Sequence, residues 1–256
     1  MIDPRAAVDA AAELDEGVSV GPFAVIGPGV RIGRGTTIGP HAVIQGPTTI
    51  GADNRIFQFA SVGEIPQDKK YRGEDTRLEI GDRNVIRECA TVHRGTVQDE
   101  GVTRIGSDGL FMAYAHVAHD CHIGDHVIMA NGATLAGHVV IEDHVILGGF
   151  TLVHQFCSIG AHSFTAMGTA IGKDVPPYLM VSGNPAKPHG INAEGLKRRG
   201  FTAEQLKVLK AAYRILYLSG LKLKEARLRL GEMSADAPEV ARLAEFLVRS
   251  RRSIVR

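Results

Sequence analysis

The sequence predicts a mainly β protein, in which a left-handed parallel β-helix is followed by a small α-helical domain. A six-residue apolar period runs through most of the chain as far as Ile171, and the pattern becomes helical and basic after residue 185. No apolar run reaches the roughly 18 residues that a membrane span needs. The three cysteines are far apart and do not suggest a disulfide framework. We therefore expect a cytoplasmic protein without a transmembrane segment.

The six-residue period defines the first domain, which we expect over residues 1–185. Of the 25 positions in the series, only Thr165 is not apolar. An α-helix is excluded, because residues six apart point about 120° away from each other on it. One short strand and one turn per six residues fit instead, and three such hexads close a triangular coil whose strands stack about 4.8 Å apart. The series is Val8, Leu14, Val20, Ile26, Ile32, Ile38, Ile44, Ile50, Ile56, Val62, Ile80, Ile86, Val92, Ile105, Phe111, Val117, Ile123, Met129, Leu135, Ile141, Leu147, Val153, Ile159, Thr165 and Ile171.

Glycine often follows the apolar residue, as at Gly21 and Gly33, and we expect it to supply turn dihedrals that a Cβ would resist. Two polar segments, 64–79 and 93–104, interrupt the period. The first keeps the hexad register and the second shifts it by one position. Loops that leave a solenoid usually lie on its binding face, so we expect both near a site.

The second domain is expected over residues 186–256. Asn184-Pro185 and Pro188 indicate a linker. A short helix over 192–199 should end at Gly200, and a capping box at Thr202-Ala-Glu-Gln205 should begin a helix that ends at Gly220. Two more helices are expected over 222–233 and 238–252. Together these helices should cap the open end of the solenoid.

Charge is divided unevenly between the two parts. Residues 1–185 contain 13 Lys and Arg against 21 Asp and Glu, whereas residues 186–256 contain 16 against 7. The basic part suggests an anionic partner, although a solvated helical surface explains the same charges.

The histidines permit three interpretations. His116, His119, His122 and His126 are spaced closely enough to suggest zinc, but on a solenoid they turn corners rather than share a face. A structural role suits His126, His144 and His162, which recur at every third hexad and should form an outward, solvent-exposed ladder, as well as His41 and His189.

Catalysis is the third interpretation. His119 is followed by Asp120, and stacking places His138 one coil from Asp120 and Gly137 one coil from His119. A carboxylate beside an imidazole orients it and stabilises its conjugate acid, which suits a base that accepts a hydroxyl proton. The residues alone leave this open, since most His-Asp pairs are inert.

Seven segments together resemble the UDP-N-acetylglucosamine 3-O-acyltransferase family, which begins lipid A synthesis in Gram-negative bacteria. The resemblance covers essentially the whole chain. The segments are IDP at 2–4, HRGTVQ at 93–98, AHVAHDCHIG at 115–124, TLAGHV at 134–139, VHQFCSIGAH at 153–162, KDVPPY at 173–178 and GLKRRGF at 195–201.

The resemblance implies a homotrimer with active sites between neighbouring prisms. It implies transfer of a 3-hydroxyacyl group from acyl carrier protein to the 3-hydroxyl of UDP-N-acetylglucosamine, without a metal or cofactor and without a nucleic-acid partner. It assigns the general base to His119, its orienting partner to Asp120 and the oxyanion-binding amide to Gly137. Its other substrate-binding positions are Gln67, Asp68, Lys70, His116, His138, His154, Gln155, Asn192, Glu194, Arg198 and Arg199.

The resemblance also gives Met167 a role in acyl-chain length, because the family closes its acyl groove with a side chain at this position. A methionine there predicts a chain nearer 3-hydroxydecanoyl than 3-hydroxymyristoyl. The alternative is that Met167 only packs the core. The acidic carrier protein should dock on the basic tail, for which Lys207, Lys210, Arg214, Lys222 and Lys224 are candidates.

Four other functions were weighed. The N-acyltransferase of the same pathway has an additional N-terminal uridine-binding domain, whereas the repeats here begin at Val8, and we reject it. Three alternatives stay open: a hexapeptide acyltransferase that uses another donor or the 3-amino sugar, a zinc carbonic anhydrase, and a non-catalytic solenoid.

Overall fold

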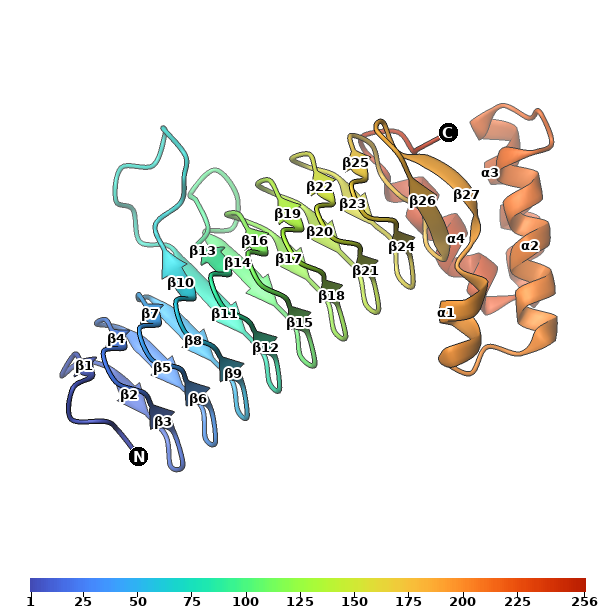
Figure 1. Cartoon of the computed structure of the whole chain (residues 1–256). Helices are drawn as coiled ribbons and strands as arrows, with labels where there is room; N and C mark the ends of the chain where they lie inside the picture. Colours follow the sequence, from blue (N-terminus) through green and yellow to red (C-terminus); the bar gives the residue numbers. More distant parts are fainter.

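The chain winds into the expected left-handed β-helix, a three-sided prism with helices at its C-terminal end (Figure 1). The structure is a computed structural model that describes residues 1–256, the side chain of Asp236 excepted. Through most of the chain every third strand pairs in parallel, and the three faces contain nine, eight and ten strands. We call them the first, second and third faces, and name the three edges of the prism by the faces that they join.

The first face contains β1 (Ala7–Val8), β4 (Val25–Ile26), β7 (Val43–Ile44), β10 (Ser61–Glu64), β13 (Thr91–His93), β16 (His116–Val117), β19 (Thr134–Leu135), β22 (Leu152–Val153) and β25 (Ala170–Ile171). The second face contains β2 (Glu13–Leu14), β5 (Val30–Ile32), β8 (Thr48–Ile50), β11 (Arg77–Ile80), β14 (Val102–Ile105), β17 (His122–Ile123), β20 (Val140–Ile141) and β23 (Ser158–Ile159).

The third face contains β3 (Ser19–Val20), β6 (Thr37–Ile38), β9 (Arg55–Ile56), β12 (Val85–Ile86), β15 (Leu110–Phe111), β18 (Ile128–Met129), β21 (Ile146–Leu147), β24 (Phe164–Thr165), β26 (Leu179–Ser182) and β27 (Lys187–Ile191).

The apolar residue of each hexad fills the interior of the prism, as predicted. Ile26, Ile44 and Val62 stack in register on the first face and are at most 1% exposed. Thr165 is also fully buried, and its hydroxyl is satisfied because it lies 2.7 Å from the Thr151 hydroxyl. One polar residue in the series is therefore accommodated by a partner in the preceding coil.

The glycines of the hexads serve a different purpose from the one expected. Gly21 and Gly33 lie outside the left-handed region; instead, an added Cβ would lie 2.8 Å from Pro40 N and 2.7 Å from Gly51 C in the next coil. Close approach of neighbouring coils therefore excludes side chains there. The left-handed conformation falls two positions later, mostly on residues with side chains: Phe23, His41, Asp53, Phe59, Arg83, Cys89, Asp108, Tyr114, Asp120, His126, His138, His144, Phe150, Phe156 and His162.

Both inserted loops leave the prism at the edge between the first and second faces (Figure 1). An uninterrupted period would pair Ile50 with Asp68, three hexads on, but Ile50 pairs with Ile80, so the first loop adds two whole hexads. Likewise Ile80 pairs with Ile105 and not with Gln98, so the second loop adds one hexad and one further position. The predicted effects on register are confirmed. The strands extend into both segments, which leaves residues 65–76 and 94–101 as the loops proper.

The segment predicted as a linker instead forms the turn of a β-hairpin. β26 continues the parallel third face, and β27 pairs with it antiparallel and ends that face. Pro188 is tolerated because β27 is an edge strand. The division at residue 185 falls in this turn, and the two-domain description stays a prediction.

The helices begin where predicted, but two end earlier. They are α1 (Ala193–Arg198), α2 (Ala203–Tyr217), α3 (Leu223–Met233) and α4 (Pro238–Arg249), with the short 3₁₀ helix η1 (Ser234–Asp236) between the last two. Thr202 and Gln205 form the predicted capping box, and Pro238 occupies the first turn of α4. α2 ends at Tyr217, before Gly220, and α4 ends at Arg249, before residue 252. The apolar pattern in the sequence continues past the last residue with helical hydrogen bonds, so the sequence places both helix ends too late.

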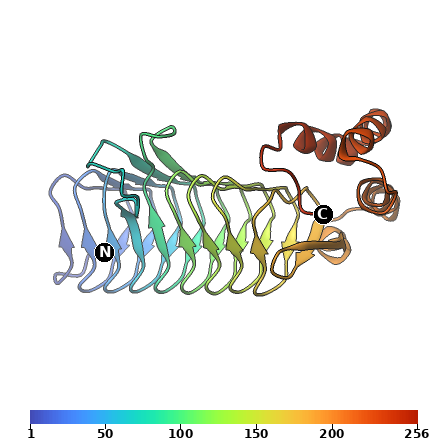
Figure 2. The same ribbon diagram turned by 90° about the horizontal axis from the view of Figure 1, so that it is seen from above.

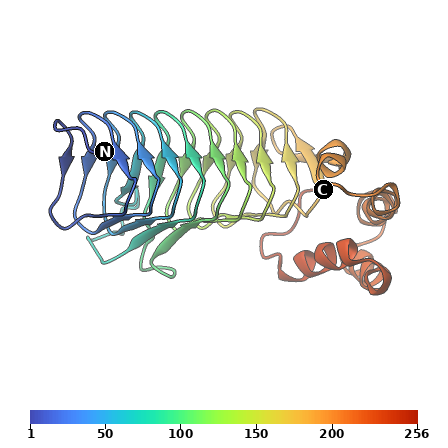
Figure 3. The same cartoon turned by 90° about the horizontal axis from the view of Figure 1, so that it is seen from below.

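Figures 2 and 3 show from above and below that the helices lie beside the last coils. Leu196, Leu206 and Leu209 pack with Tyr178 of the final coil. None of the helices that the structure describes combines the length and the hydrophobicity needed to cross a bilayer.

Candidate active site

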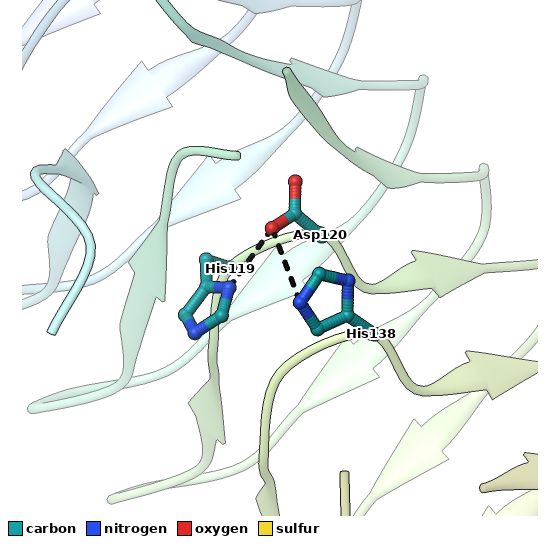
Figure 4. Close-up of side chains that lie close together, drawn as sticks. All are labelled: His119, Asp120 and His138. Carbon is teal, nitrogen blue, oxygen red and sulfur yellow. Dashed lines mark hydrogen bonds and ion pairs between the residues drawn. The ribbon is translucent and has the colours of Figure 1, made fainter. Parts of the chain in front are cut away.

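Three of the predicted site residues meet at the edge between the first and second faces (Figure 4). His119 and Asp120 lie in the turn between β16 and β17, and His138 lies in the corresponding turn one coil later. Asp120 Oδ2 lies 2.9 Å from His119 Nδ1 and 3.7 Å from His138 Nε2. An ionised carboxylate only accepts hydrogen bonds, so His119 donates from Nδ1 and its Nε2 is left as an acceptor.

Asp120 is a buried carboxylate held by the second loop. Its side chain is 1% exposed. Thr96 donates to it twice, from the backbone N–H to Oδ1 (2.7 Å) and from the hydroxyl to Oδ2 (2.6 Å). Burial opposes ionisation, but the hydrogen bonds from His119 and Thr96 outweigh it and lower the pKa of Asp120. The carboxylate is therefore anionic at neutral pH and polarises the imidazole.

Gly137 lies against the ring of His119. An added Cβ would lie 2.7 Å from His119 Nε2, so only glycine leaves the imidazole in place. Within the part of the chain that the structure describes, the Gly137 N–H has no hydrogen-bond acceptor. A free amide donor and a free imidazole nitrogen thus lie next to each other, as acyl transfer to a hydroxyl requires.

Asp99 and Phe156 hold the His138 ring in place. Asp99 of the second loop accepts from His138 Nδ1 at 2.9 Å, and the Phe156 ring stacks on the imidazole with centroids 4.4 Å apart. The His119 and His138 rings meet edge to face, with centroids 5.1 Å apart. The loop at 94–101 therefore fixes both histidines, one through Asp120 and one directly.

His116 lies on β16, three residues before His119. Its Nδ1 is 2.7 Å from the Thr91 hydroxyl, and its ring meets His93 edge to face. Burial and the neighbouring His119 lower the pKa of His116, and burial with His116 nearby lowers the pKa of His93 to about 4. Both imidazoles are therefore neutral at neutral pH and add no positive charge beside His119.

Two hollows meet at His119. One, of about 710 Å³, runs over the first face from His119 toward the C-terminal end and is largely apolar; it is lined by Gln67, His116, Ala118, His119, Thr134, Leu135, Ala136, Gly137, Leu152, Val153, His154, Ala170, Ile171, Gly172, Asn184 and Pro185. The other, of about 750 Å³, is polar and is lined by Gln67, Asp68, Lys69, Lys70, Gln98, Asp99, His119, His138, Gln155, Phe156 and Arg251. An apolar groove and a polar one thus meet at the His119 imidazole.

The remaining predicted residues lie elsewhere in this chain. Asn192 caps α1, and its side-chain amide donates to the His162 carbonyl at the edge between the second and third faces. Glu194, Arg198 and Arg199 belong to the same helix or its end. None of these four lines the hollows beside His119 among the described residues.

Met167 lies at the third edge, between the third and first faces. Its side chain is 77% exposed, so the alternative that it packs the core is wrong. A role at the end of an acyl groove needs a surface from outside this chain to cover it.

The four closely spaced histidines do not form a metal site. His122 lies on the second face, and His126 lies at the next edge. Among the described residues, the group with ligand atoms within 4.8 Å of one another is His119, Asp120 and His138 instead. Both Asp120 oxygens already accept hydrogen bonds from Thr96.

The predicted histidine ladder forms, but it is not solvent-exposed throughout. His126, His144 and His162 stack with centroids 4.7 and 4.8 Å apart. His126 is exposed, whereas His144 and His162 are partly covered, and Tyr178 and Phe201 also pack on His162. Burial, with His144, Arg199 and Arg242 nearby, lowers the pKa of His162 to about 3.

Sequence reasoning missed Thr96, Asp99, Phe156 and Arg251. Thr96 belongs to the segment HRGTVQ, which the family resemblance singled out without giving it a role. Phe156 could have been found by its spacing of three hexads from His138. Asp99 and Arg251 are brought to the site by a loop and by the C-terminal tail, for which no spacing rule applies.

Comparison with known proteins gives the family of the chain. A model described as UDP N-acetylglucosamine O-acyltransferase domain 2 matches residues 174–255, and a bacterial transferase hexapeptide model matches 11–46 and 103–137. Proteins named acyl-(acyl-carrier-protein)–UDP-N-acetylglucosamine O-acyltransferase are 58% identical in Janthinobacterium sp. (strain Marseille) and 57% identical in Stutzerimonas stutzeri, covering 100% of this chain and 99% of theirs.

Solved structures give the same result. The UDP-N-acetylglucosamine acyltransferase of Francisella novicida is 45% identical with a TM-score of 0.98, over 100% of this chain and 94% of that one. The O-acyltransferase of Moraxella catarrhalis is also 45% identical, with a TM-score of 0.97 over 100% and 99%. On identity over its full length, on fold and on repeat pattern, the protein belongs to the UDP-N-acetylglucosamine O-acyltransferase family.

Proposed function

We propose that this enzyme transfers a 3-hydroxyacyl group from acyl carrier protein to the 3-hydroxyl of UDP-N-acetylglucosamine, the first step of lipid A synthesis. The observation that carries the proposal is the contact of His119 with both Asp120 and Gly137 where an apolar groove meets a polar one. The apolar groove suits an acyl chain, and the polar one suits a sugar. The names of the full-length relatives agree with these two substrates.

His119 is the general base. A sugar hydroxyl is too weak an acid to ionise at neutral pH, so its proton must leave as its oxygen attacks the thioester carbon. Nε2 of His119 takes that proton, and Asp120 on Nδ1 stabilises the imidazolium that forms. When the carbon–sulfur bond breaks, the imidazolium returns the proton to the departing thiolate. The thioester is already activated, so the residues present are sufficient for the reaction.

The Gly137 N–H stabilises the tetrahedral intermediate. Negative charge develops on the former carbonyl oxygen, and one aimed amide donor is typically worth about 3 kcal/mol there. The amide is free to donate and lies against the His119 ring. His116 and His138 flank the base, with Gln67, Asp68 and Lys70 of the first loop beside it, where they would bind the sugar.

We infer that the active enzyme is a homotrimer in which each site is built by two chains. The base lies at the edge between the first and second faces, whereas Asn192 lies at the edge between the second and third. If the remaining edge faces the threefold axis, the first face of one chain meets the third face of the next, and these two outer edges come together. Arg198 and Arg199 of the neighbour would then bind the diphosphate through their fork geometry.

The edge assigned to the axis has the expected surface. Exposed aromatic side chains follow it, with Phe23, Phe59, Tyr114 and Phe150 each at least half exposed. Large apolar side chains in a row on a free surface favour association. Met167 lies on the same edge and shortly precedes β25, whose residues line the C-terminal end of the apolar groove, so its side chain would close the groove there.

The position of Met167 supports a short acyl chain. A thioether side chain at the axial end of the groove would occupy the volume of several methylenes, which favours 3-hydroxydecanoyl over 3-hydroxymyristoyl. Met167 would contribute this limit only in the trimer, where a neighbouring chain covers its exposed side chain.

Acyl carrier protein would bind the basic C-terminal part, since carrier proteins are acidic. Lys210 and Arg214 line a hollow of about 270 Å³ between α2 and β27 and are the sharpest candidates, with Lys207, Lys222 and Lys224 beside them in sequence. We place the enzyme in the cytoplasm, in keeping with the free thiols of Cys89, Cys121 and Cys157.

A mass-spectrometric transfer assay tests the function. Purified protein is given 3-hydroxyacyl carrier proteins of 10, 12 and 14 carbons with UDP-N-acetylglucosamine or its 3-amino analogue. Formation of the O-acylated sugar nucleotide is expected, fastest with the 10-carbon donor. Transfer only from a small coenzyme A thioester, or only to the amine, would replace the proposed reaction.

A further inference from the structure

The second loop places a buried threonine against the Asp120 carboxylate. Thr96 is fully buried, and two of its donors reach the two oxygens of one carboxylate at 2.7 and 2.6 Å. Hydrogen bonds to an ionised carboxylate at these distances are charge-assisted and strong. Asp120 Oδ2 accepts from both the Thr96 hydroxyl and His119 Nδ1, so the hydroxyl and the imidazole share one oxygen.

Contacts within the loop and at its start hold Thr96 in this position. Thr96 O accepts from the N–H groups of Asp99 and Gly101, which closes the loop around Thr96. At Gly95 an added Cβ would lie 2.7 Å from Val102 Cα, so glycine allows the two limbs of the loop to meet. Arg94, on the other side, donates to the Gly46 carbonyl from its side chain and to the Glu64 carbonyl from its backbone. The position of Thr96 is thus fixed by the closure of the loop and by the anchoring of Arg94 to the prism.

We propose that Thr96 is a positioning residue for the reaction: it holds the Asp120 carboxylate anionic and turned toward His119, so that Nε2 of the imidazole faces the acceptor hydroxyl. This rests on the proposed function of His119 as the base. Thr96 lines neither of the two hollows described beside His119, so it acts only through Asp120. Its removal therefore affects the rate of the chemical step more than the binding of either substrate.

Other titratable groups lie near the His119–Asp120 pair, and an effect of replacing Thr96 must be distinguished from theirs. His138 Nε2 lies 3.7 Å from Asp120 Oδ2, and Asp99 contacts the far nitrogen of His138. Around the polar groove lie Asp68, Lys69, Lys70 and Arg251. Thr96 differs from all of these because it is neutral, so replacing it alters the hydrogen bonding of Asp120 without altering the charge of the site.

The test replaces Thr96 by Val, which has the same shape but no hydroxyl, and by Ser, which keeps it. Thr103 is the matched control: it too is a fully buried threonine in contact with Asp120, but its hydroxyl accepts from the Asp120 backbone N–H at 2.8 Å and does not touch the carboxylate. We expect Thr96→Val to lower kcat about 10- to 100-fold with little change in KM, and Thr96→Ser to restore most of the loss.

The pH profile gives a readout that a purely structural role would not change. The hydrogen bonds of Thr96 lower the pKa of Asp120 in the folded enzyme, so losing the hydroxyl raises that pKa. The acid limb of kcat/KM, which belongs to the His119–Asp120 pair as a unit, should therefore move to higher pH in Thr96→Val and stay in place in Thr103→Val.

A substrate-free measurement separates this proposal from the proposed function. The downfield proton resonance of the His119 Nδ1–H, assigned by its loss in His119→Ala, should shift in Thr96→Val and be retained in Thr96→Ser and Thr103→Val. If the wild-type protein transfers no acyl group, the function fails while this resonance still tests the positioning.

Several results would overturn the proposal. A folded Thr96→Val variant with kcat within twofold of wild type and an unmoved resonance would do so, as would a folded Thr96→Ser variant as slow as Thr96→Val. Equal losses and equal acid-limb shifts in Thr96→Val and Thr103→Val would show a general packing effect instead. If Thr96→Val does not fold, Thr96→Ala and Thr96→Ser give the same comparison.

Discussion

Two edges of the same prism carry a column of histidines, but only one column has the geometry of a catalytic site. At the edge between the second and third faces, His126, His144 and His162 stack nearly parallel on one another. At the edge between the first and second faces, His119 and His138 meet edge to face and both contact carboxylates. The hexad repeat places the same type of turn between strands at both edges.

The difference comes from what is added to the repeat. The edge between the first and second faces receives both loops, of which the second brings Thr96 and Asp99, and the turn at this edge supplies Asp120. The other edge receives α1 and the chain after it, which bury His162 between Tyr178 and Phe201. Carboxylates therefore orient the histidines at one edge, whereas the histidines at the other edge stack on one another and on aromatic rings.

Replacing the base should have the largest effect. His119→Ala is expected to lower kcat about 10³- to 10⁴-fold, because the acceptor proton then has no base and the Asp120 carboxylate has no imidazolium to stabilise. The oligomeric state should be unchanged from that of the wild-type protein, as measured by light scattering. His126→Ala, at the exposed end of the other column, is the matched control and should stay within twofold of wild type. Comparable losses in both variants would remove the distinction between the two edges.

Gly137→Ala should have the next largest effect. The added Cβ would collide with the His119 ring, so the imidazole must move and the amide beside it is displaced. A loss of about 10²-fold in kcat is expected, similar to that on losing an oxyanion donor. In Gly149→Ala the added Cβ would lie an ordinary 3.5 Å from Asn131 O, so this control should be nearly neutral. Near-normal turnover of Gly137→Ala would contradict the site geometry.

Met167→Gly tests the third edge, where no histidine column lies. We expect the ratio of kcat/KM for the 14-carbon donor to that for the 10-carbon donor to rise about tenfold or more, since each buried methylene contributes about 0.8 kcal/mol. The measurement is competition between the two acyl carrier proteins, read by mass spectrometry. An unchanged ratio, or a wild-type enzyme that already favours the longer donor, would discard Met167 as the length determinant.

Acid should weaken the structural column. The pKa of His162 is lowered from 6.5 to about 3 by burial, so below pH 6.5 the unfolded chain binds a proton that the folded chain does not. The contribution of His162 to the free energy of unfolding is therefore fully present above pH 6.5 and is lost as the pH is lowered toward 3. His162→Phe should reduce this pH dependence, so that its Tm falls about 2–4 °C less than that of wild type between pH 6.5 and 5. Parallel curves for the two proteins would contradict the account.

Chelation should have the smallest effect. Treatment with EDTA is expected to leave the transfer rate within twofold of its starting value, because the proposed reaction uses His119, Asp120 and Gly137 without an ion. The control is the same treatment followed by added zinc. Loss of activity on chelation and recovery with zinc, alongside stoichiometric zinc by elemental analysis, would favour the zinc alternative.

Most of the prism could be predicted from the sequence because its register is a matter of counting. The hexad determines which residues point inward, and a spacing of three hexads placed Gly137 beside His119 and His138 beside Asp120. The reason given for the glycines was wrong, because a period reveals where a residue lies but not what approaches it. Gly21 is required by the next coil and not by its own dihedrals.

The rest of the site could not be predicted by counting residues along the repeat. Thr96 and Asp99 are placed by the closure of a loop, and the β26–β27 hairpin contains Asn184-Pro185 and Pro188, which suggested a linker. The position of Asn192, Arg198 and Arg199 away from His119 also became visible only with the fold. Residues outside the repeat depend on contacts between distant segments, which periodicity does not encode.

Subunit complementation tests most directly whether the two edges of neighbouring chains form one site. His119→Ala and the double variant Arg198→Ala, Arg199→Ala are each expected to be nearly inactive alone. Unfolded together and refolded as mixed trimers, they should regain about a quarter of the wild-type rate, because sites then form between an intact first edge and a neighbour's intact helix end. A chain with all three changes, mixed with itself, is the control. Mixed trimers without regained activity would contradict the account.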